Sequence, residues 1–359
     1  MIIKDLDSLL ALTFNSSTKL ALALKPASPT YSASLPVILD LTKHASGIIH
    51  CIHLLNAELH GTTLVKEVKF HVKSILEALR AVVQTFLNLA ARGPSTASGG
   101  MAGEEYLVRT GALHDLITQA RGPNGIPKDN LSAICRGWKM DRGALEDSLR
   151  EVSEMIEGAE KSDESDHTED DEDDGWDELG LGDTATVKMD KDELARTKNV
   201  QHLFVVFNQL FLNVLFQVHS ILRLITLLHK RILLDLLSST PTPPQNAVLD
   251  ALLLQSHALL AVSDELVSSL YVPQNHASIR KDSLALLNVI NALQLQLRVF
   301  FPDSSSLEQQ LSGLSIDQST STPSKPKADK KWFDICFDQI VKTSANLAAP
   351  SSKPSRKAT

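Results

Sequence analysis

The feature that most constrains this 359-residue chain is an apolar stripe between residues 65 and 89. Its members recur at alternating spacings of three and four, the heptad pattern of a helix with one buried seam. They are Val65, Val68, Val72, Ile75, Leu79, Val82, Phe86 and Leu89. Such a stripe must be covered by other helices. Because further helices are predicted on the same chain, we expect a bundle core rather than a free leucine-zipper dimer.

Apolar periodicity predicts helices along most of the remaining chain, and the composition agrees. Hydrophobic residues make up 43% of the sequence and aromatic residues only 5%, while glycine and proline are scarce for a turn-rich β or α/β protein. Besides the striped helix, we expect helices near 6–25, 37–59, 104–120, 130–156, 189–237, 246–270, 278–301 and 332–347. Pro36 is placed in the first turn of the second of these, where proline is tolerated. The predicted fold class is all-α.

Composition shifts divide the chain into two helical bundle domains and several connecting segments. The predicted segments are an N-terminal five-helix bundle (1–157), an acidic disordered linker (158–186), a C-terminal helical bundle (187–302), a Ser/Thr/Pro/Lys linker (303–329), a short C-terminal helix (330–347) and a disordered basic tail (348–359). The two bundles are predicted to be up-and-down because their connections are short or flexible.

Negative charge is concentrated in one segment. Twelve acidic residues and one lysine lie between Glu160 and Glu178, whereas the formal charge of the whole chain is only −8. The segment is either a solvated linker or a site that attracts a basic partner segment by its negative charge. Thr168, with Asp171 three residues later, is a candidate phosphorylation site. The candidate partner-binding residues are Asp170, Asp171, Glu172, Asp173, Asp174 and Trp176.

The sequence shows no apparatus for catalysis. It contains no GxGxxG or GxxxxGK[ST] loop in a strand context and no GxSxG nucleophile motif. His50 and His53 are spaced to share one side of a helix, but two ligands do not make a metal site. We therefore expect no enzyme activity, no cofactor and no bound metal. A helical-bundle metalloenzyme built around these two histidines stays as an alternative.

Membrane anchoring is a second alternative. Leu203 to Leu222 contains no formally charged residue and has the length of a bilayer core, although several polar residues interrupt it. A buried central helix is preferred over a membrane anchor at about 203–228. Basic residues gather only near 325–331 and 353–357, so no nucleic-acid partner is expected. The odd cysteine count and the charges at Lys4, Asp5 and Asp7 favour an intracellular protein without a signal peptide.

Several short motifs occur in an order that points to a known family. They are HGTTLVKEV at 60–68, TGAL at 110–113, IPKDN at 126–130, an acidic run ending in WDE at 176–178, and SDELVSSLYVPQ at 263–274. Together they resemble the GCIP family of cyclin-D-interacting, Maid-like proteins. The likeness covers about Leu6 to Val299.

This resemblance implies a non-enzymatic, all-helical adaptor with bundle domains similar to those of talin and vinculin, found in cytoplasm and nucleus. It also implies binding to cyclin D and to helix-loop-helix transcription factors, with effects on cell-cycle progression or transcription. Relative to the family pattern, Val200 to Ser220 looks like an insertion, and one hypothesis is that it is a translated intron. Arg231-Ile232-Leu233 matches the Arg-x-Leu cyclin-docking pattern, but its leucine is expected to be buried.

Overall fold

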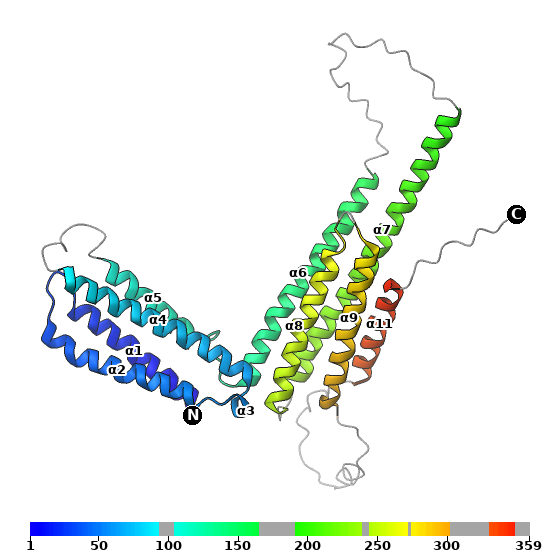
Figure 1. Cartoon of the computed structure of the whole chain (residues 1–359). Helices are drawn as coiled ribbons and strands as arrows, with labels where there is room; N and C mark the ends of the chain where they lie inside the picture. Colours follow the sequence, from blue (N-terminus) through cyan, green and yellow to red (C-terminus); the bar gives the residue numbers. More distant parts are fainter. Residues whose placement is uncertain (93–103, 165–190, 239–243, 272–273, 302–329, 349–359) are drawn as a thin grey trace, which may run out of the picture. The chain divides into compact units, whose positions relative to one another are not determined.

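The computed structural model describes residues 1–92, 104–164, 191–238, 244–271, 274–301 and 330–348, with side chains omitted at a few helix ends and over 191–208 (Figure 1). All regular secondary structure in these ranges is helical, which confirms the all-α prediction. The helices are α1 (Ile2–Ala23), α2 (Tyr31–Leu54), α3 (Ala57–His60), α4 (Thr62–Arg92), α5 (Glu105–Arg121), α6 (Asn130–Glu164), α7 (Lys191–Arg231), α8 (Asn246–Ser268), α9 (His276–Leu297) and α11 (Lys330–Ala348). A π-helix, η5 (Ile232–Leu237), continues α7, and a short 3-10 helix, η6 (Arg298–Phe300), follows α9.

The chain forms two compact units, each built from separate segments. Unit 1 contains residues 1–138 and 241–253, and unit 2 contains residues 139–240 and 254–359. The boundaries between the units therefore fall within α6 and α8. The domain limits and linkers inferred from the sequence stay a prediction, although α6 includes the first part of the segment assigned to the acidic linker.

The core of unit 1 is formed around the predicted stripe of α4. Its first seven members, from Val65 to Phe86, are buried, and Leu89 is partly buried against the same core. Within the unit, α1 packs along α2 and α5, and α5 packs along α4, whereas α2 and α4 meet over only a short stretch (Figure 1). The heptad pattern is thus covered within the chain, as a bundle core requires.

The second helix begins earlier than its sequence suggests. α2 starts at Tyr31, so Pro36 lies beyond the first turn rather than within it. The first turn is closed by the amide of Ser34, which donates to the carbonyl of Thr30 at 3.2 Å, and by its hydroxyl, which donates to Tyr31 at 2.8 Å. Ser32 and Pro36 are both exposed, so water can satisfy the carbonyl that proline leaves without a donor.

Unit 2 buries one face of α7 and is completed by the last helix. Six aliphatic side chains in the described part of α7 are fully buried: Leu215, Val218, Ile221, Leu222, Ile225 and Leu228. α11 packs on α7 and α9. It contributes Phe333 and Phe337, each at most 2% exposed, and the thiol of Cys336. The buried central helix predicted over 203–222 stays a prediction, because the side chains of 203–208 lie outside those that the structure describes.

Candidate functional site

The N-terminus of α4 is fixed by a carboxylate from a distant part of unit 1. Asp250 on α8 accepts the backbone N–H of Thr62 at 2.7 Å and that of Thr63 at 3.1 Å, and it also accepts the Thr63 hydroxyl at 2.7 Å. Asn130, the first residue of α6, donates its side-chain amide to Asp250 at 3.2 Å and accepts the N–H of Leu64 at 3.1 Å. These bonds satisfy helix-end donors that have no partner within α4.

Gly61 makes this close approach possible. Its φ of 93° lies in the left-handed region, and a Cβ at this position would come within 2.0 Å of Asn130 Cγ. Gly61 and Asn130 belong to two of the motifs that carry the family resemblance, HGTTLVKEV and IPKDN. The structure therefore gives these motifs a shared physical role, which is to anchor the start of α4.

Burial raises the pKa of the Asp250 carboxyl, but its hydrogen bonds outweigh this effect. The Thr63 hydroxyl, the two backbone amides and the Asn130 amide all favour the charged form, so the pKa lies below its ordinary value. Asp250 is consequently a carboxylate at neutral pH. Its negative charge also complements the positive end of the α4 dipole.

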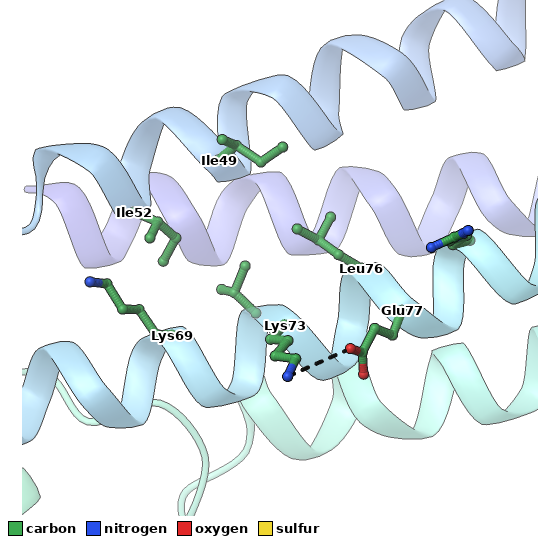
Figure 2. A pocket seen from close by; sticks show the side chains of 8 residues that line it. Ile49, Ile52, Lys69, Lys73, Leu76 and Glu77 are labelled. Carbon is green, nitrogen blue, oxygen red and sulfur yellow. Dashed lines mark ion pairs between the residues drawn. The ribbon is translucent and has the colours of Figure 1, made fainter.

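Further along α4, the short contact with α2 leaves an open apolar groove. Ile49 and Ile52 of α2 and Val72 and Leu76 of α4 line a hollow of about 370 Å³. Figure 2 shows Ile52 and Leu76 pointing into the space between the two helices. Ile49 is 44% exposed, whereas Val72 is buried at the base. This hollow, lined by the four aliphatic side chains, is called the α2/α4 groove below.

The rim of the α2/α4 groove is mainly basic. Lys69, Lys73 and Arg80 line it together with a single acid, Glu77, and all four belong to α4. Lys73 Nζ lies 3.9 Å from Glu77 Oε1, the contact drawn in Figure 2. The side chains of this pair are 77% and 67% exposed, so water screens their attraction. An apolar floor beside an excess of positive charge is suited to binding an amphipathic segment rather than to performing a reaction.

Unit 2 contains a buried polar network that sequence spacing did not reveal. Ser256 donates its hydroxyl to Asp141 Oδ2 at 2.5 Å, and His229 Nε2 lies 2.8 Å from the same hydroxyl oxygen. The Ser256 hydroxyl has one hydrogen and uses it in the hydrogen bond to Asp141. The hydrogen bond between His229 and Ser256 must therefore be donated by His229 Nε2. His257 Nδ1 contacts both oxygens of Asp141, Oδ1 at 3.0 Å and Oδ2 at 2.9 Å.

The direction of these hydrogen bonds is unsuited to a nucleophilic serine. Burial, assisted by the charge of Arg142, lowers the pKa of His229 to about 3, so the ring is neutral. A general base must accept a hydrogen bond from the serine hydroxyl, whereas here His229 donates to Ser256 and the Asp141 carboxylate accepts the hydroxyl's hydrogen bond. Ser256 and His229 are both completely buried. The network links α6, α7 and α8 and has a structural role.

The Arg-x-Leu sequence is already engaged within unit 2. Leu233 is 3% exposed, which confirms the predicted burial of its leucine. The guanidinium of Arg231 pairs with Asp235 at 2.8 Å and lies 4.8 Å from the centre of the Trp332 ring. A docking partner would need access to both Arg231 and Leu233, so this sequence is not presented as a ligand in the folded unit.

The residues predicted to bind partners lie outside the described ranges. These are Asp170, Asp171, Glu172, Asp173, Asp174 and Trp176, together with the candidate phosphorylation site Thr168. His50 and His53 are described, and both are exposed on α2. Across the described ranges, no three His, Cys, Asp or Glu side chains are grouped so that they could hold a metal ion.

Four described helical stretches are long and apolar enough to span a membrane when only length and composition are considered. They are Thr62–Ala91, Gln209–Leu237, Asn246–Ser268 and His276–Phe300. The second overlaps the anchor considered at 203–228. About a third or less of the residues in each stretch are buried within the protein.

Comparison with known protein families agrees with the motif order. The N-terminal part of the Grap2 and cyclin-D-interacting family matches residues 5–158, and the C-terminal part of the same family matches residues 169–295. No curated protein matches the chain. The two family matches together cover most of the sequence and follow one another in the family's own order. The chain therefore belongs to the family of Grap2 and cyclin-D-interacting proteins, GCIP.

Proposed function

We propose that the protein is a non-enzymatic helical adaptor that regulates cell-cycle progression or transcription by binding other proteins. The observation that carries this proposal is the α2/α4 groove, an apolar hollow that stays open between two helices of unit 1 and has a mainly basic rim. Such grooves bind the apolar face of a partner helix. Membership of a family named for interaction with cyclin D supports a D-type cyclin as one partner, and the motif resemblance supports helix-loop-helix transcription factors as another.

The direct test is a titration of a purified D-type cyclin into the intact chain, with binding measured by isothermal titration calorimetry. A purified helix-loop-helix protein is titrated in parallel, and a helical protein unrelated to either class serves as the control. We expect saturable binding to at least one of the two candidate partners and none to the control. Absence of binding to both partners by a correctly folded chain would contradict the proposal.

The acidic segment contributes to partner recruitment in this proposal. Its charge favours attraction of basic surfaces over long distances, which acts more on the association rate than on affinity. Affinity purification from cells, with the intact chain and with a variant lacking residues 158–186, tests this role. If both versions return the same partners in the same amounts, the segment acts only as a spacer. Localisation to cytoplasm and nucleus is part of the same proposal and is checked by imaging the tagged chain.

Membrane association is the second candidate function, favoured by the length and apolar character of Gln209–Leu237. Its expected signature is pelleting of the full chain with membranes after carbonate extraction. A variant lacking 203–228 should then remain in the supernatant. Against this candidate, the apolar face of α7 already packs inside unit 2. Recovery of the intact chain in the carbonate supernatant would exclude stable insertion.

A further inference from the structure

We propose that the α2/α4 groove binds an acidic amphipathic helix of a partner protein. This inference rests on the proposed adaptor function and specifies the chemistry of the partner at that site. The partner helix places its apolar side chains against Ile49, Ile52 and Leu76 and its carboxylates beside the basic residues of the α4 rim.

The floor of the groove requires an apolar ligand face. It is formed by aliphatic side chains from two helices, and Ile49 keeps 44% of its surface exposed. Water in contact with such a surface is released when a complementary apolar face covers it. A helix presents apolar side chains at i, i+3, i+4 and i+7 along one side, which is the spacing needed to follow a seam between two helices.

The apolar surface extends beyond the hollow itself. Counting back from Ile52 in steps of three and four, the same stripe of α2 passes through Ile49, Ala45 and Thr42 to Ile38 and Leu35. Ile38 is 43% exposed and Leu35 is 65% exposed, so this stripe is uncovered at its N-terminal end as well as at Ile49. From Leu35 to Ile52 a helix rises about 26 Å, which sets the ligand at about four to five turns.

α4 presents a matching exposed stripe. Steps of three and four from Leu76 pass through Arg80 to Val83 and Leu87. Val83 is 41% exposed and Leu87 is 58% exposed. Apolar residues therefore remain open on both helices, and the basic residues of the rim interrupt this row only on α4.

The charge of the rim determines which sign of charge the partner helix should carry. Lys69, Lys73 and Arg80 stand against a single carboxylate, Glu77, which is weakly paired with Lys73. Among the described residues, Lys69 and Arg80 make no ion pair. A basic ligand would be repelled along this rim, whereas glutamate and aspartate beside the apolar face would find complementary charges. Charge thus specifies an acidic helix.

The test uses two synthetic helical peptides of about 18 residues, which span the required length. Both carry leucine at i, i+3, i+4 and i+7, and they differ only in flanking residues, which are glutamate in one and lysine in the other. Each is titrated into the full chain and followed by fluorescence polarisation. We expect the acidic peptide to bind at least about tenfold more tightly than the basic peptide, with the difference shrinking as salt is added.

Charge-reversed variants of the full chain locate the binding. One variant combines Lys69→Glu, Lys73→Glu and Arg80→Glu. It should bind the acidic peptide about tenfold more weakly and the basic peptide more tightly than the unmodified protein does. The matched control changes three exposed lysines outside the groove: Lys4→Glu, Lys19→Glu and Lys25→Glu. It alters the net charge equally and should leave the peptide preference unchanged. Circular dichroism of each variant establishes that the helices are retained.

A second pair of variants tests the apolar floor without changing charge. Ile49→Ser should weaken the acidic peptide several-fold, because it removes an exposed contact of the groove. Leu12→Ser is the control, since Leu12 on α1 is 47% exposed and does not line the groove. Equal weakening by both substitutions would contradict the assignment of the peptide to the groove.

Other results would overturn the inference while leaving the adaptor function intact. If both peptides bind equally well, or if the charge-reversed rim has no effect on binding, the assignment of an acidic ligand to the groove is wrong. Self-association abolished by the rim variant would assign the groove to a second copy, and tighter peptide binding after deletion of 165–186 would assign it to the chain's own acidic residues. If the rim variant still binds cyclin normally, the adaptor acts through another surface. If the acidic peptide binds but neither proposed partner does, the groove stands and the proposed function fails.

Discussion

The carboxylate of Asp250 receives the backbone N–H of Thr62 at 2.7 Å, although 188 positions separate the two residues in the sequence. This contact brings α8 to the first turn of α4 within unit 1. It also determines where α4 begins, since the same carboxylate accepts the amide and hydroxyl of Thr63. The helix that carries the basic rim of the groove is therefore held by a cap from the second half of the chain.

Removal of this cap should destabilise unit 1. Asp250→Ala leaves the amides of Thr62 and Thr63 without their acceptor, and we expect a loss of about 1–3 kcal/mol in the free energy of unfolding. Asp250→Asn keeps one acceptor oxygen and should have a smaller effect. Urea unfolding followed by circular dichroism measures both. Asp40→Ala is the control, because Asp40 is exposed and makes only a surface pair with Lys43 at 3.6 Å; it should change stability by less than about 0.5 kcal/mol.

The cap also gives unit 1 a dependence on acid. The folded pKa of Asp250 lies below its unfolded value of 3.8, so its contribution is complete above that pH and is lost as the pH falls through the folded pKa. Asp250→Asn should therefore reduce the loss of stability below about pH 4 relative to the unmodified protein. An identical acid profile for both proteins would contradict the assignment of a carboxylate cap.

Two glycines provide a matched test of backbone strain. Gly61→Ala places a Cβ within 2.0 Å of Asn130 Cγ at a φ of 93°, and we expect a loss of about 2–4 kcal/mol. Gly111→Ala lies inside α5 with no atom within 4 Å of the new Cβ. It should stabilise the protein by up to about 1 kcal/mol, because alanine is the better helix former. Thermal unfolding of both variants decides between these opposite signs.

A matched pair on α11 tests whether the last helix belongs to the core of unit 2. Phe337 is 1% exposed and Ile335, on the same helix, is 52% exposed. Phe337→Ala should lower the free energy of unfolding by about 3–5 kcal/mol through lost burial and a cavity. Ile335→Ala should cost less than about 1 kcal/mol. Similar small effects of the two changes, measured by urea unfolding, would show that α11 is loosely attached.

The sequence predicts the core of α4 well because heptad spacing is a local signal. Its stripe from Val65 to Phe86 is buried as expected. The groove could not be predicted, since Ile49 and Leu76 have the same character and spacing as core residues. Which apolar stripe stays open depends on how α1, α2, α4 and α5 pair, and this pairing is not encoded in any one helix.

Local sequence patterns also could not predict the Asp250 cap or the buried polar network of unit 2. Asp250 occurs in an apolar stretch and has no capping motif near it, because the helix that it caps lies far away in the sequence. Ser256, His229 and Asp141 are likewise separated and match no catalytic spacing. In contrast, Gly61 and Asn130 belong to recognised motifs, but their role became clear only from the left-handed backbone and the contact between them.

The buried network of unit 2 predicts a second pH dependence of stability. It begins nearer neutral pH than the one assigned to Asp250. The pKa of His229 is about 3 in the folded protein and 6.5 in its ordinary state, so only the unfolded chain binds this proton between those values. Stability is complete above pH 6.5 and should fall toward pH 3 with a slope of up to about 1.4 kcal/mol per pH unit from this group. Urea unfolding at pH 7.5 and pH 5 measures the change.

His229→Gln isolates this contribution, because glutamine keeps an N–H that can donate to Ser256 but does not titrate. We expect the variant to be less stable than the unmodified protein at pH 7.5, because its shape differs in a closed core, but to lose less stability on acidification to pH 5. His219→Gln is the control, since His219 lies on α7 outside the network and is only partly buried. Equal acid sensitivity of His229→Gln and the unmodified protein would mean that burial does not lower the pKa of His229 in the folded protein, and the pH dependence assigned to this residue would then be wrong.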